Sequence, residues 1–143
     1  MPLQGSKLGV SDVPYFDTAG VHLTALQEML LQSHSLTAPG KTDPTSGGPI
    51  VLLPAVPKDW AGRFKLRARG GFLVTVEFQP GRRVERVLIE SERGQTLALA
   101  NPFQQCRVLN GGKELLSTKD ATIRLPTQKG DVLEFVESQS PNP

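Results

Sequence analysis

Residues 71–78, GFLVTVEF, are the stretch that decides the fold. Apolar side chains occupy every second position from Phe72 to Phe78, and the positions between them carry a mixture that includes Thr75 and Glu77. A period of two is typical of a β-strand that covers a core with one face only. The abundance of valine and phenylalanine favours a strand as well. We therefore predict a strand here, with its even-numbered residues facing a core.

Short runs of the same kind fill the chain from residue 50 onward. They are separated by glycine-containing turn signals at 79–83, 91–95, 110–113 and 128–131. Many short strands with turns at this spacing indicate a mainly β fold, an antiparallel β-sandwich of seven or eight strands. The predicted core comprises Leu52, Leu53, Phe72, Val74, Val76, Phe78, Val87, Ile89, Leu97, Leu99, Ile123, Val132 and Phe135.

One long helix is predicted before the β region, in FDTAGVHLTALQEMLLQSH at residues 16–34. Its apolar residues cover more than half of a helical surface, so it needs burial on several sides. We expect Leu26 and Leu30 to press on the sandwich, on a partner or on a second copy of the chain. Residues 35–49 are rich in Pro, Gly, Ser and Thr, which is typical of a linker. The predicted division is therefore 1–34 for the lead-in and helix, 35–49 for the linker, 50–139 for the sandwich and 140–143 for a tail.

The composition excludes several classes of function. A formal charge of +2 over 143 residues gives no reason to expect binding to nucleic acid. The lone Cys106, with only His22 and His34 for company, predicts no metal site, and no motif predicts a cofactor. No run approaches the roughly 20 apolar residues of a membrane span, and residues 1–10 lack the apolar core of a signal peptide. We expect a cytoplasmic protein if Met1 is the natural start, and a periplasmic or secreted one if the chain is a fragment.

Three strings in the chain resemble the carboxyl end of glycoside hydrolase family 95: EMLLQSH at 28–34, IVLLPAVPKDW at 50–60 and LRARGGFLVTVEF at 66–78. The family is known for inverting 1,2-α-L-fucosidases, in which an (α/α)6 helical barrel carries the active site and a small β-sandwich follows. The resemblance implies that the helix is the last helix of such a barrel. It also implies that the chain is a carboxyl-terminal segment that supports a missing catalytic barrel domain and is inactive alone.

The resemblance also assigns a candidate catalytic residue. The general base of the family is an aspartate at the start of this last helix, and counting back eleven residues from Glu28 gives Asp17. Inversion needs a base that activates water and an acid about 6.5–9.5 Å away, and the acid would lie in the missing barrel. The chain reads TAGVH at 18–22, where members usually have a Gly-Asn-Phe-Gly type loop, so the geometry around the base differs. The alternative role of Asp17 is to cap the helix.

Two further features keep a binding function open. Arg63, Lys65, Arg67 and Arg69 alternate with apolar residues, so one strand face carries four cations. The apolar residues are Phe64, Leu66 and Ala68. This face is either a solvated outer face or a surface that docks on the barrel or on an anionic glycan, with Arg67 and Arg69 as the candidate contacts. Trp60 either packs on its own sheet or stacks on a sugar ring. The rival hypothesis is therefore a stand-alone carbohydrate-binding or protein-interaction module, with fucosylated glycans as candidate ligands.

Overall fold

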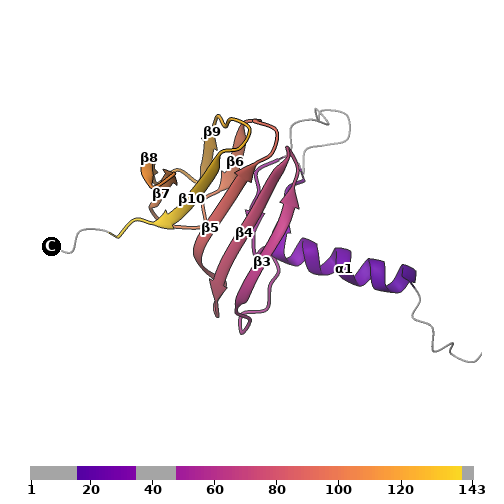
Figure 1. Cartoon of the computed structure of the whole chain (residues 1–143). Helices are drawn as coiled ribbons and strands as arrows, with labels where there is room; N and C mark the ends of the chain where they lie inside the picture. Colours follow the sequence, from indigo (N-terminus) through magenta and orange to yellow (C-terminus); the bar gives the residue numbers. More distant parts are fainter. Residues whose placement is uncertain (1–15, 35–47, 140–143) are drawn as a thin grey trace, which may run out of the picture.

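The computed structural model describes residues 16–34 and 48–139. Over these residues one helix precedes a set of antiparallel sheets, which confirms the predicted fold class (Figure 1). The elements in chain order are α1 (Phe16–Leu30), β1 (Leu31–Gln32), β2 (Val51–Leu52), β3 (Gly62–Ala68), β4 (Phe72–Gln79), β5 (Arg83–Ser91), β6 (Leu97–Ala100), β7 (Cys106–Asn110), β8 (Lys113–Thr118), β9 (Thr122–Leu125) and β10 (Val132–Glu137).

The main sheet has six strands in the order β3-β4-β5-β10-β7-β8. Hairpins join β3 to β4, β4 to β5 and β7 to β8, and β10 enters between β5 and β7. In β4 the register places Val74 opposite both Leu66 of β3 and Ile89 of β5. Directly paired residues point to the same side of a sheet, so the apolar alternation of β4 continues into its neighbours.

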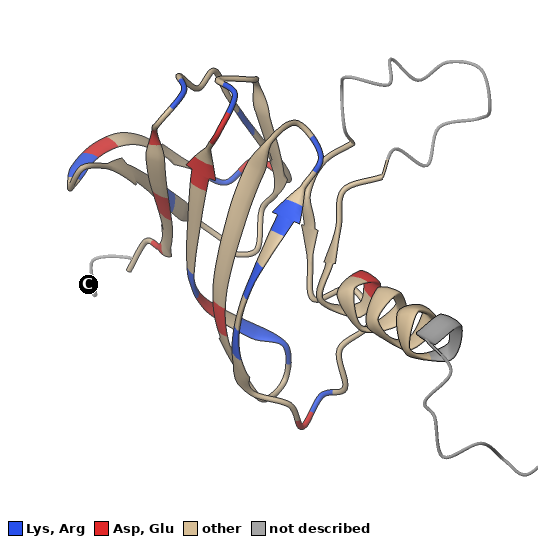
Figure 2. Cartoon of the chain, turned by 45° about the vertical axis from the view of Figure 1, so that its right-hand side comes forward, with Lys and Arg blue, Asp and Glu red and all other residues tan. Residues whose placement is uncertain are grey.

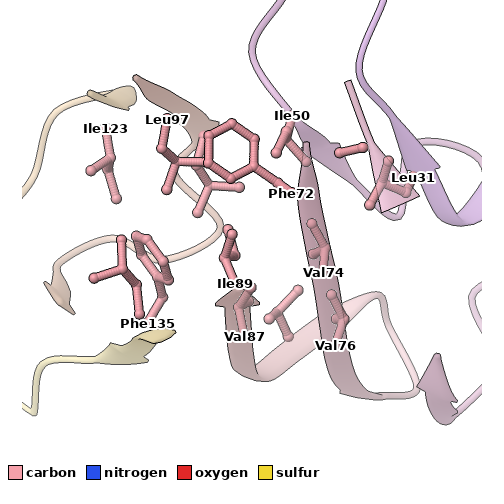
Figure 3. Close-up of a cluster of buried hydrophobic side chains, with 14 of the residues drawn as sticks. Leu31, Ile50, Phe72, Val74, Val76, Val87, Ile89, Leu97, Ile123 and Phe135 are labelled. Carbon is pink, nitrogen blue, oxygen red and sulfur yellow. The ribbon is translucent and has the colours of Figure 1, made fainter. Parts of the chain in front are cut away.

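The second layer is smaller and is assembled from distant segments. β1 pairs with β2, and β6 pairs with β9. Ile50, just before β2, links the two pairs through a parallel bridge to Leu99 of β6. Figure 3 shows side chains of this layer, such as Leu97 and Ile123, pointing toward Phe135 and Phe72 of the main sheet. The core lies between the two layers.

The predicted core is confirmed with two differences. Leu52 is partly buried and packs against the core. Val132 was predicted to be buried but is 46% exposed, so that prediction is wrong. Leu133 pairs with Ile89 and Phe135 pairs with Val87, so the odd-numbered residues of β10 face inward. Val132 therefore points to the outer face.

The glycines of the four predicted turns all have positive φ, as do both glycines between β3 and β4. Gly94, between β5 and β6, is closely approached by the backbone of another segment. Its φ is +70°, and a Cβ added there would lie 2.9 Å from the backbone nitrogen of Lys129. Its N–H donates to the buried Ser91 hydroxyl, which bonds Thr127 in turn. This contact joins the end of β5 to the loop before β10.

The helix ends at Leu30, four residues before the end of the predicted stretch. The chain then pairs Leu31 with Leu52 and Gln32 with Val51, so strand pairing with a distant segment replaces the last helical turn. In Figure 1, α1 leaves the β domain on the side of β3 and projects away from it. Residues 19–27 are all exposed, which differs from the burial expected for so apolar a helix.

Candidate functional site

The three strings that carry the family resemblance meet at the carboxyl end of α1. Leu53 N donates to Leu30 O at 2.8 Å, and Ala55 N donates to Met29 O at 3.3 Å. The last carbonyl groups of a helix have no partner within the helix, and here the segment after β2 supplies donors to two of them. From the third string, Arg69 N donates to Ser33 Oγ at 3.0 Å. The exit of α1 is therefore fixed to both layers of the β domain.

A shallow pocket of about 390 Å³ opens at this junction, between α1 and the edge of β3. Its lining combines apolar side chains with polar and charged ones. The lining residues are Gln27, Glu28, Leu31, Ser33, His34, Leu66, Arg67, Ala68 and Arg69. The structure thus brings the predicted candidates Arg67 and Arg69 together with His34 of the first string.

Ion pairs neutralise most of the basic strand. Arg63 pairs with Glu77 at 3.5 Å, and Lys65 pairs with Glu90 at 2.9 Å. These pairs lie on the outer face of the main sheet, so the interpretation as a solvated, neutralised face accounts for Arg63 and Lys65. Exposed pairs of this kind add little to stability.

Arg67 is paired in the same way. It contacts Glu92 through two hydrogen bonds, of 3.0 and 3.3 Å. The hydrogen bond from Arg67 is the largest effect on Glu92 and lowers its pKa. Burial opposes this, and attraction to Arg67, Arg93 and Lys65 lowers the pKa further. The hydrogen bond to Glu92 likewise raises the pKa of Arg67.

The described part of α1 is apolar, exposed and almost without charge. Val21 is 69% exposed, Leu23 61% and Leu26 38%. Glu28 is the one charged residue between positions 19 and 30, so the described part of the helix is almost entirely tan in Figure 2. Contiguous exposed apolar surface of this kind marks an interaction site in soluble proteins.

Comparison with known families identifies the β region. The family model described as "Glycoside hydrolase family 95, C-terminal domain" matches residues 45–135, well over half of the chain. The chain belongs to glycoside hydrolase family 95. None of the curated proteins matches it. The match covers the family 95 C-terminal domain and does not include α1, whose likeness to a barrel helix therefore stays a proposal.

Trp60 is placed far from Arg67 and Arg69 in this family 95 domain. It lies just before β3, in a turn closed by Trp60 N donating to Pro57 O, and it is 43% exposed. Arg67 and Arg69 lie at the other end of β3, which at seven residues spans roughly 20 Å. The structure therefore does not bring Trp60 and the two arginines into one site.

Asp17 is the second residue of α1, inside the first helical turn. Its side chain lies outside the described part of the chain, so its role as a base or as a cap stays a prediction. His22 is exposed on α1. Within residues 16–34 and 48–139, no group of three or more His, Cys, Asp or Glu could hold a metal ion. Among the described residues, no helix has the length and apolar character that crossing a membrane requires.

Sequence reasoning did not find two contacts that join distant segments. Ser33 accepts from a residue 36 positions away, and Arg82 Nε donates to Val56 O at 2.6 Å. Both depend on the register of segments far apart in the chain, and neither leaves a local pattern in the sequence. The pairing of Glu28 with His34, at 2.7 Å, has a weak local signal because both belong to EMLLQSH.

Proposed function

We propose that this chain is the carboxyl-terminal, structural segment of a family 95 glycosidase of the α-L-fucosidase type, and that it supports a catalytic barrel through α1. The observation that carries the proposal is the exposed, nearly uncharged helix attached to a family 95 C-terminal domain. A helix that is apolar on most of its surface is stable in water only when other elements cover it.

The sequence of α1 has the spacing of a packing seam. Ala19, Leu23, Leu26 and Leu30 follow one another at intervals of four, three and four residues, so they form one stripe along the helix. At the inner end of this stripe, Leu30 packs against the core of the β domain. At the outer end, Leu23 and Leu26 are exposed. A neighbouring helix of a barrel is the natural partner for such a stripe.

The attachment of α1 favours a fixed orientation over a loose tether. Backbone bonds to Leu30 and Met29, the pairing of β1 with β2 and the Glu28–His34 pair all act on its last turn and exit. A domain that holds a helix by its end in this way presents the helix to a partner in one direction. This suits a supporting role for the helix start, where Asp17 lies.

Catalysis by the chain alone is not expected. Asp17 is the candidate general base by resemblance, and a base without its acid partner does not hydrolyse a glycosidic bond. We expect no release of fucose or galactose from 2-linked substrates by the purified chain. Hydrolysis that Asp17→Asn abolishes would contradict this expectation.

The docking role is tested by co-purifying the full chain with a family 95 catalytic domain that lacks its own C-terminal domain. We expect a complex that Leu23→Asp with Leu26→Asp disrupts. Leu115→Asp is the matched control, because Leu115 is 51% exposed but lies on β8, at the far edge of the main sheet. If the helix variant bound as well as the control, α1 would not be the docking element.

The second candidate function is a module that binds glycan at the exposed Trp60. An exposed indole suits stacking on a pyranose ring, although the separation of Trp60 from Arg67 and Arg69 leaves such a site without those cations. Titration with fucosylated oligosaccharides separates the two functions. A glycan-binding module should show saturable quenching of Trp60 fluorescence, whereas a supporting domain should show none.

A further inference from the structure

The pocket at the end of α1 has an apolar floor and a charged rim. Leu31 and Ala68 are buried, and Leu66 is partly buried against the core. Gln27, Glu28 and His34 form the rim on the helix side, and Arg67 and Arg69 form it on the β3 side. A side chain with an aliphatic stem and a polar end fits this combination.

Two of the three charged lining residues already have partners. Glu28 pairs with His34 at 2.7 Å, and Arg67 pairs with Glu92 at 3.0 Å. Arg69 differs from both. Its backbone N–H donates to Ser33 Oγ, but no ion pair joins its guanidinium to any acidic side chain of the described residues. Arg69 is therefore the cation of the pocket whose charge the described chain leaves uncompensated.

The charge and shape of the pocket together indicate its ligand. A guanidinium offers a planar fork of donors that matches a carboxylate. Ser33 and Gln27 add polar groups beside it, and the apolar floor accommodates the methylene groups of a glutamate. The pocket also continues the exposed surface of α1, since Gln27 and Glu28 follow Leu26 directly.

We infer that this pocket receives an acidic side chain, glutamate or aspartate, of the catalytic domain that packs on α1, and that Arg69 is its ion-pair partner. The inference rests on the proposed docking function and adds to it a second, polar contact. The apolar stripe of α1 supplies contact area, and the pair at Arg69 fixes the position of the partner along the helix. Charged contacts of this kind contribute specificity and register to an interface.

The test measures the affinity of the full chain for a family 95 catalytic domain by calorimetry, at low and high salt. The variant is Arg69→Gln, which keeps polarity and removes charge. The control is Arg83→Gln, because Arg83 is also exposed and lies in the hairpin at the other end of the sheet. We expect Arg69→Gln to weaken binding about tenfold and to reduce its salt dependence. Arg83→Gln should change neither.

Two results would overturn the inference and are distinguishable. If the wild-type chain binds and Arg69→Gln binds equally well with unchanged salt dependence, the docking function survives and the acidic contact is wrong. If the wild-type chain does not bind at all, the proposed function fails and the inference fails with it. Circular dichroism of the variants confirms that a loss of binding does not come from unfolding.

Discussion

A matched pair of leucine truncations tests whether the chain itself buries the apolar side chains of α1 that lie away from the β domain. Leu133 lies in β10 and is 2% exposed, whereas Leu23 lies in α1 and is 61% exposed. Leu133→Ala leaves a cavity between the layers and should lower the free energy of unfolding by about 3 kcal/mol. For a domain of this size that corresponds to a drop in Tm of roughly 10–25 °C.

Leu23→Ala should change the free energy of unfolding by less than about 0.5 kcal/mol. Little buried surface is lost, and alanine is at least as good a helix former as leucine. The assay is urea unfolding of the isolated chain, followed by far-ultraviolet circular dichroism and by the fluorescence of Trp60. A loss of about 1.5 kcal/mol or more for Leu23→Ala would show that the chain itself buries this side of α1, which would refute the reasoning.

Three further predictions concern the β domain. Gly94→Ala should lower the free energy of unfolding by about 1–3 kcal/mol in a thermal melt, because the new Cβ would meet a backbone atom at 2.9 Å. Gly81→Ala should lower it by less, because Gly81 has a φ of +84° but lies in open space. Burial raises the pKa of Cys106 to about 11, so the native thiol should react with a disulfide reagent far more slowly than the urea-unfolded thiol, and equal rates would contradict its burial. The pKa of Glu92 is lowered, so its pair with Arg67 stabilises the fold at pH values above the ordinary carboxyl pKa of 4.5 and loses this effect as the pH falls through the lowered pKa. Arg67→Ala should therefore shift the urea midpoint slightly at pH 7 and not at strongly acidic pH.

The sequence predicts the β domain well where its period is regular. In GFLVTVEF all four even-numbered residues are buried, as the alternation predicts. Thr75 on the other face is buried as well, which the alternation does not predict. The prediction for DVLEFVE was wrong at Val132, since apolar residues occur on both faces of that strand and only the pairing with β5 decides which face is inside. β8 was not predicted, because KELLST at the edge of the sheet has no alternating apolar pattern and buries little.

The candidate site was less predictable than the fold. The sequence indicates that Arg67 and Arg69 lie near family strings, but their difference depends on where Glu92 and Ser33 arrive in three dimensions. For the helix, the sequence pattern is clear but the structure does not supply the expected cover. Its apolar sequence predicts burial on several sides, but no described part of this chain covers Leu23 or Val21. A sequence pattern reports a need for burial and does not say which chain supplies it.

The most direct test of the docking account is hydrogen exchange of the full chain, measured with and without a family 95 catalytic domain. We predict that addition of the catalytic domain slows exchange of the amides of α1 and of residues 66–69, which border the pocket. Exchange around Trp60 should stay the same. Unchanged exchange along α1, or protection confined to the turn at Trp60, would contradict the claim that this helix is the surface through which the domain supports its enzyme.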